Sequence, residues 1–215
     1  MRNFLNPDNV VMSFITRIVY AVWLNILWFI FSLPVFTAGA STTALFYVTL
    51  KMVKNEEGDI TSQFIRAFRE NFRFSTKVWL IILAAQAVLA LDGYVLWHMR
   101  FSSAFWTFLT AVYIVLLAAC FIFAMYIFPL MARFENTIRA MFINSVMIGL
   151  RYLLCTAAMA AIYFIMLLII VRFFTPAVIF GEGLCAFLCS YLLSGIFDRL
   201  APPEDPPEEN TAEKT

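Results

Sequence analysis

The sequence predicts an all-α, polytopic membrane protein with about six membrane helices. Hydrophobic residues make up 63% of the chain and charged residues 13%, whereas soluble proteins usually have about 45–50% apolar and about 25% charged residues. Two long stretches, 101–132 and 152–171, contain no charged residue. Each can supply the roughly 20 apolar residues with which an α-helix crosses a bilayer. Because neither stretch leaves a polar face for water, a soluble helical protein is excluded.

Basic residues in the polar segment 51–77 indicate the orientation of the chain. This segment holds six of the fifteen Lys and Arg residues and separates two hydrophobic blocks. Short loops rich in Lys and Arg stay in the cytoplasm, so we expect this segment on the inner side. If the preceding segment 34–53 crosses the membrane, the N-terminus is also cytoplasmic, which agrees with Arg2 and Arg17. If it does not cross, the N-terminus lies outside.

An N-terminal hairpin is predicted over residues 1–54. Its first span covers about 18–33, with Asn25 near the middle, where an amide is expected to face other helices rather than lipid. Pro34 ends this span or starts the next segment.

The segment after Pro34 begins with small and hydroxyl residues and allows two interpretations. Gly39, Ser41, Thr42 and Thr43 lie close together in it. In the first interpretation they form the small face of a short second span, and the hydroxyls bond back to their own helix. In the second, the segment is broken or re-entrant and lines a polar cavity, because irregular backbone persists at membrane depth only when it is shielded from lipid.

The first of two repeat units is predicted over residues 55–129. It opens with an amphipathic helix on the inner membrane surface, an elbow helix, capped by Asp59 or Thr61. Apolar residues recur there at helical spacing, and charged residues occupy the other side. A hairpin of two spans follows, over about 78–97 and 104–128, and Pro129 is expected to end it.

The second unit, residues 130–200, repeats the first with a shift of 73 residues. Arg66 and Asn71 reappear as Arg139 and Asn144 in a second elbow helix. Spans over about 152–171 and 178–197 complete a parallel repeat, whose pseudo-axis lies along the membrane normal. The tail 201–215 is acidic and rich in proline, so we expect it to be disordered.

Six side chains are candidates for a polar membrane site. Asp92 is the acidic residue deepest in a span, and a carboxylate there costs at least about 2.5 kcal/mol, so coupling to a proton or cation is one interpretation. The other is an Asp near the outer interface that reaches water or bonds to Asn25 or the nearby hydroxyls. The candidate set is Asn25, Gly39, Ser41, Thr42, Thr43 and Asp92.

Four elbow residues, Arg66, Asn71, Arg139 and Asn144, are the second candidate set. They are expected either to fix each elbow to its span or to form a docking surface for a cytoplasmic partner or anionic lipid. No metal or cofactor is predicted, because Cys185 and Cys189 are better interpreted as packed or lipid-facing cysteines than as metal ligands. The single histidine and the absence of a nucleophile loop argue against an enzyme, and nothing indicates nucleic-acid binding.

Several motifs in the first third of the chain resemble the YesL-like family of bacterial integral membrane proteins. These are Asn6-Pro7-Asp8-Asn9, residues 33–44 (Leu-Pro-Val-Phe-Thr-Ala-Gly-Ala-Ser-Thr-Thr-Ala), Tyr47-Val48-Thr49-Leu50-Lys51, and residues 56–68 with Asn71-Phe72. The resemblance implies a bacterial plasma membrane and a neighbourhood of carbohydrate uptake genes. It supplies no catalytic residues and no substrate.

Two functions follow as expectations. The first is a non-enzymatic accessory or assembly subunit of a carbohydrate uptake system, with a sugar permease or a second copy as partner and both termini in the cytoplasm. The alternative is a small transporter or channel whose polar path runs near Gly39–Thr43 and Asp92. A transporter should contain a polar cavity that joins these residues, whereas an accessory subunit should have a filled core and a large apolar surface.

Overall fold

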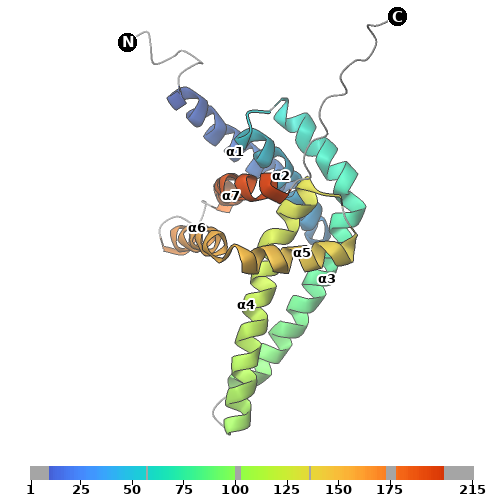
Figure 1. Ribbon diagram of the computed structural model, residues 1–215, viewed down its shortest axis with the longest axis vertical. Coiled ribbons are helices and arrows are strands. Elements are labelled where there is room, and N and C mark those ends of the chain that lie inside the picture. The colour runs from blue at the N-terminus through green and yellow to red at the C-terminus, as the bar shows by residue number, and fades with distance from the viewer. Residues whose placement is uncertain (1–9, 57, 100–102, 136, 173–177, 201–215) are drawn as a thin grey trace, which may run out of the picture.

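A computed structural model describes residues 10–56, 58–99, 103–135, 137–172 and 178–200. Over these ranges every regular element is helical and no strand occurs (Figure 1). The fold class predicted from the sequence is therefore confirmed as all-helical. The elements are α1 (Val10–Ser32), the 3-10 helix η1 (Val35–Thr37), α2 (Ala38–Val53), α3 (Ile60–Met99), α4 (Ala104–Arg133), α5 (Ile138–Arg151), α6 (Leu153–Arg172) and α7 (Val178–Leu200).

The turn between α1 and α2 forms at Pro34, as predicted. Pro34 has extended backbone angles of φ −75° and ψ 106°, which end α1 because proline cannot donate a backbone hydrogen bond. The Thr37 hydroxyl donates to the carbonyls of Phe31 at 2.5 Å and Pro34 at 2.6 Å and fixes the turn. The segment that follows is an unbroken helix of 16 residues, about 24 Å long. The interpretation of this segment as broken is therefore wrong over Ala38–Val53, whereas whether α2 crosses the membrane or is re-entrant stays a prediction.

One continuous helix, α3, replaces the expected elbow and span of the first unit. It has 40 residues and is about 60 Å long, twice the thickness of a bilayer hydrocarbon core. Asp59 caps it, as expected, by accepting from the Thr61 backbone N–H at 3.2 Å; the hydrogen bond from Ser62 lowers the pKa of this exposed carboxyl. The first half packs on α2, where Ser75 donates to the Thr43 hydroxyl, and Trp79 Nε1 donates to the carbonyl of Val35 in η1 at 2.7 Å.

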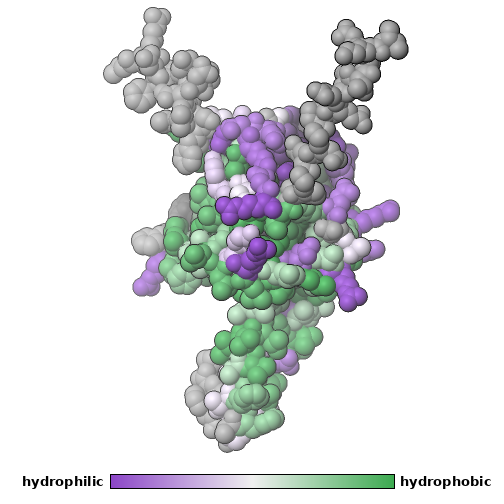
Figure 2. Space-filling view, viewed as in Figure 1, coloured by the Kyte–Doolittle hydropathy of each residue, from purple (hydrophilic) through white to green (hydrophobic). Residues whose placement is uncertain are grey.

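Beyond Trp79, α3 leaves α2 behind and pairs with α4. The two helices extend together away from α1, α2 and α7 (Figure 1). The surface of this hairpin is mostly hydrophobic, whereas hydrophilic residues gather at the opposite end of the molecule (Figure 2). The charged residues of α3 from Arg66 to Lys77 lie in its first half, so the helix is polar where it packs on α2 and apolar where it extends.

The end of α4 differs from the expectation at Pro129. The helix continues through this proline to Arg133, although proline costs one backbone hydrogen bond inside a helix. Residues on both sides of it, Tyr126, Ile127, Leu130 and Met131, are at most 5% exposed. Burial of these side chains offsets the lost bond, so α4 ends one turn later than predicted.

The second elbow helix exists as a separate element. Thr137 caps α5 by accepting from the Ala140 backbone N–H at 3.4 Å, and the helix ends before Tyr152, whose backbone is not helical (φ −113°, ψ 51°). The next helix, α6, starts directly after this residue. The two predicted units thus differ, because the first elbow is continuous with its span and the second is not, and the internal repeat stays a prediction.

Five helices in the described part of the chain are long and apolar enough to cross a membrane. They are α1, α3, α4, α6 and α7, with apolar windows of mean hydropathy between 1.3 and 2.7. These findings indicate a multi-pass membrane protein. The 16 residues of α2 fall short of the usual length of a span, so a sixth span is not confirmed. The predicted tail 201–215 lies outside the described residues, as do residues 100–102 and 173–177 between the spans of the two predicted hairpins.

Candidate functional site

A group of fully buried polar side chains lies between α1, α2, α3 and α7, and we call it the polar seam. Each of these side chains is 0% exposed, although they lie among apolar helices. Buried polar groups in such surroundings need hydrogen-bond partners. The members of the polar seam are Asn25, Ser41, Thr43, Thr49, Ser75 and Ser190.

Asn25 joins α1 to α7. Its Oδ1 atom accepts from the backbone N–H of Gly183 at 2.7 Å. A Cβ atom at Gly183 would collide with the carbonyl oxygen of Ala21 and would lie 2.8 Å from the Cβ of Asn25. Because only glycine fits at this contact, it allows the two helices to approach closely, as small residues do between membrane helices.

The hydroxyls of α2 bond to helix backbones, as the first of the two sequence interpretations expects. Thr43 donates to the carbonyl of Gly39 at 3.0 Å, and Ser41 donates across to the carbonyl of Trp28 in α1 at 3.0 Å. Thr42 donates to Ala38 and also accepts from the Trp28 indole at 3.0 Å. These residues therefore connect packed helices.

The remaining contacts of the polar seam run between side chains. Ser75 of α3 donates to the Thr43 hydroxyl at 3.1 Å, and Thr49 of α2 shares a hydrogen bond of 2.8 Å with Ser190 of α7. Gly39 lies against Trp79, so α2 and α3 are in close contact at that level too. The polar seam thus joins α2 to both α3 and α7 through short, paired hydroxyl contacts.

Asp92 does not lie with the other candidates of the polar membrane set. It is exposed, in the apolar half of α3, and lines a groove of about 350 Å³ with side chains of α3 and α4 that include Trp106 and Tyr113. The structure therefore groups Asn25, Gly39 and Ser41–Thr43 around α2 and places Asp92 elsewhere.

The elbow residues lie on separate surfaces. Arg66 is exposed and donates to Glu70 one turn along α3 at 2.8 Å, and the Asn71 amide donates to the carbonyl of Ala67 at 3.0 Å. Both side chains therefore bond within their own helix. In α5, Arg139 is exposed, whereas Asn144 lines a groove between α5 and the end of α4.

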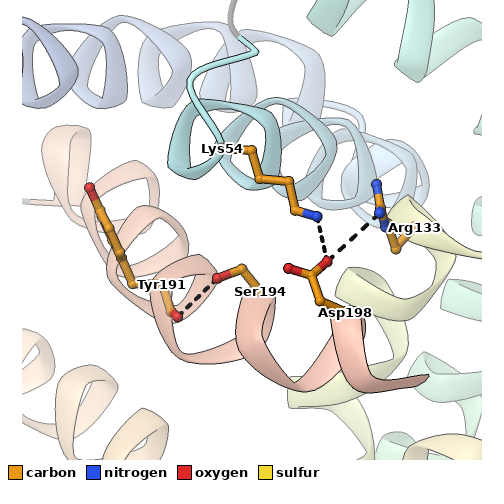
Figure 3. A network of polar contacts seen from close by, with 5 residues as sticks. All are labelled: Lys54, Arg133, Tyr191, Ser194 and Asp198. Carbon is orange, nitrogen blue, oxygen red and sulfur yellow. Dashed lines mark hydrogen bonds and ion pairs between the residues drawn. The ribbon is translucent and has the colours of Figure 1, made fainter. Parts of the chain in front are cut away.

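A cluster of charges joins the ends of three helices, and we call it the helix-end clamp. Asp198 near the end of α7 forms ion pairs with Lys54, which follows α2, and with Arg133 at the end of α4, where the N–O distance is 3.9 Å (Figure 3). The side chains are only partly exposed, at 26%, 39% and 50% for Lys54, Arg133 and Asp198. The ends of α2, α4 and α7 consequently meet at one end of the molecule.

The start of α1 lies at this same end. The Arg17 guanidinium donates to the Tyr191 hydroxyl of α7 at 2.9 Å and to the Asn55 side chain that follows α2. Trp23 of α1 also donates to the Thr61 hydroxyl at the start of α3, at 3.0 Å. Five helix termini therefore share one end, which we call the basic end because Arg17, Lys54, Arg133 and Arg199 lie there.

Sequence reasoning missed two of these features. The first is the helix-end clamp. Each of its residues is among the first charges after a long apolar stretch, and this position could have marked them as candidate partners. The sequence does not show, however, which helix ends meet. The second feature is Glu182 in α7. It accepts from the Tyr163 hydroxyl of α6 at 3.2 Å, beside the Asn25–Gly183 contact.

Replacing Asp198 with Asn is expected to destabilise the protein by about 1 kcal/mol, since it leaves two cations close together without a carboxylate. The loss should shrink in high salt, because the pair is partly exposed and therefore screened. Thermal unfolding of the purified protein at low and high salt measures it. The control is Glu70→Gln, which breaks only an ion pair within α3. It should lower the free energy of unfolding by about 0.5 kcal/mol or less. An equal loss of stability in the two variants would contradict the helix-end clamp.

Comparison with protein families gives one match. The model of the family described as "Protein of unknown function, DUF624" matches residues 21–93. This region, about a third of the chain, runs from α1 to the apolar half of α3 and contains most of the polar seam. Searches of curated proteins and of solved structures give no match. Residues 21–93 are thus similar to DUF624, the family to which the YesL-like proteins belong.

Proposed function

We propose that the protein is a non-enzymatic accessory or assembly subunit in a plasma membrane, associated with a carbohydrate uptake system. The observation that carries the proposal is the filled polar seam. Asn25, Ser41 and Thr43 are 0% exposed, and each makes a hydrogen bond to a helix backbone. A carrier would use such side chains to line a cavity at the membrane midplane, whereas here they fasten helices together.

The apolar hairpin of α3 and α4 supports a role in assembly. Beyond Trp79 its surface is mostly apolar, and Leu91, Phe105, Phe108 and Val115 are between 64% and 70% exposed. Large exposed apolar surfaces mark contacts with lipid or with other proteins. The spans of a permease are the partner that we propose for part of this surface.

The basic end is proposed to face the cytoplasm. The first half of α3 carries Arg66, Arg69, Arg73 and Lys77, and positive residues beside membrane helices favour the inner side. With this orientation the helix-end clamp lies at the inner surface, and the α3–α4 hairpin reaches toward the outer leaflet. The carbohydrate association is supported by the resemblance of the first third of the chain to YesL-like proteins.

Copurification in mild detergent tests this function. We expect a sugar permease to be recovered with the wild-type protein and to be depleted severalfold by Val115→Trp, which places a bulky side chain on the exposed hairpin. Val19→Trp is the matched control, because Val19 is similarly exposed at 59% but lies on α1. Recovery of no permease would contradict the carbohydrate association, and equal recovery with both variants would exclude the hairpin as the contact.

A further inference from the structure

Two grooves meet where the chain breaks between α5 and α6. The first, of about 640 Å³, lies between α6 and α7. The second, of about 460 Å³, lies between α5, the end of α4 and the end of α7. Arg151 and Tyr152 line both grooves, so these two residues stand between them.

Both grooves are charged at one end and apolar along their length. The groove between α6 and α7 is lined by Arg151 and by Arg199, the latter at the basic end. Leu192 lines the same groove seven residues before Arg199, which corresponds to about 10 Å along α7. Leu154 on the facing helix is 89% exposed, so the wall is open to an apolar ligand.

The two arginines are available for an anion. The guanidinium of Arg151 lies 5.8 Å from the ring centre of Tyr152, which holds it at the helix break. Within the described part of the chain, the ion pairs use Lys54, Arg66 and Arg133 and neither of these two arginines. The neighbouring carboxylate, Asp198, is engaged in the helix-end clamp.

We propose that these paired grooves bind an anionic diacyl phospholipid. The phosphate lies between Arg151 and Arg199, and each groove takes one acyl chain. Basic pockets between membrane helices bind anionic headgroups in this way. A free phosphate would not contact the apolar walls of the grooves, whereas the acyl chains of a lipid would. The inference depends on insertion in a membrane and is independent of the accessory role.

Gly195 supplies a way to block the acyl chain without disturbing the fold. It lines the groove between α6 and α7, and a Cβ atom built there meets no other atom within 4 Å. A large side chain at this position therefore enters the groove and not a packed core. Gly195→Trp is the blocking variant, Arg151→Gln and Arg199→Gln remove the charges, and Arg199→Lys keeps a charge.

Native mass spectrometry of the full chain in mild detergent tests the proposal. Phosphatidylglycerol and phosphatidylcholine with identical acyl chains are added at equal concentration. We expect the wild-type protein to prefer phosphatidylglycerol, and each Arg→Gln variant to lower that preference by about fivefold. Arg199→Lys should keep it within twofold, and Gly195→Trp should lower the binding of both lipids.

The matched control is Arg73→Gln, which removes one exposed positive charge from the first half of α3, outside both grooves. It should leave the preference unchanged. Equal binding of the two lipids by the wild type, an equal loss in Arg73→Gln and Arg151→Gln, or unchanged binding in Gly195→Trp would each overturn the proposal. None of these outcomes involves a permease, so failure here is distinct from failure of the proposed function.

Discussion

Gly183→Val is expected to destabilise the protein by about 3 kcal/mol or more. The added side chain would collide with the backbone oxygen of Ala21, which cannot move without shifting α1, and would press on the Cβ of Asn25. Overpacking of a rigid contact usually costs about 1–3 kcal/mol, and here the hydrogen bond from Gly183 to Asn25 is disturbed as well. Thermal unfolding followed by size-exclusion chromatography in detergent measures the loss.

Gly195→Val is the matched control on the same helix. A Cβ atom at this position has open space around it, and valine is a better helix former than glycine. This variant should therefore be as stable as the wild type. Equal stability of the two variants would show that α1 and α7 do not approach each other closely at Gly183.

Tyr126→Ala is expected to destabilise the protein by about 3–5 kcal/mol. Tyr126 in α4 is fully buried, and its hydroxyl shares a hydrogen bond of 2.8 Å with Thr156 of α6. Its ring also lies beside Gly149 of α5. Truncation of a buried aromatic side chain leaves a cavity, and such cavities cost about 3–5 kcal/mol of stability. We therefore expect α5, the second elbow helix, to separate from α4.

Tyr126→Phe separates packing from hydrogen bonding. The ring remains, and Thr156 keeps its bonds to the carbonyls of Gly149 and Tyr152. The expected loss is about 1 kcal/mol, the usual net value of one hydrogen bond. If the phenylalanine variant lost as much stability as the alanine variant in the same thermal assay, the ring would not be the anchor of α5 and α6.

Local chemistry allowed much of the fold to be predicted. Pro34 ends α1 because proline lacks a donor, Asp59 caps α3, and the hydroxyls of α2 return to backbone carbonyls. Each of these effects acts within a few residues, so the sequence itself contains the cause. The long apolar segments likewise appear as helices, because no polar alternative exists for their backbone in a membrane.

The errors arise where distant packing decides. Pro129 lies within α4 because its neighbours are buried against other helices, and α3 continues through the expected elbow because α2 packs along its first half. The helix-end clamp joins residues 54, 133 and 198, which no local pattern connects. Likewise, the position of Asp92 on a hairpin beyond α2 follows from the length of α3.

The central claim is that both elbow regions lie on one side of the membrane, at the basic end. Cysteine labelling tests it most directly, with Arg69→Cys and Arg139→Cys placed singly in a chain whose four native cysteines are replaced. A membrane-impermeant thiol reagent should leave both sites unlabelled in intact cells and label both in inverted vesicles. Labelling of one site from outside and the other from inside would contradict the account.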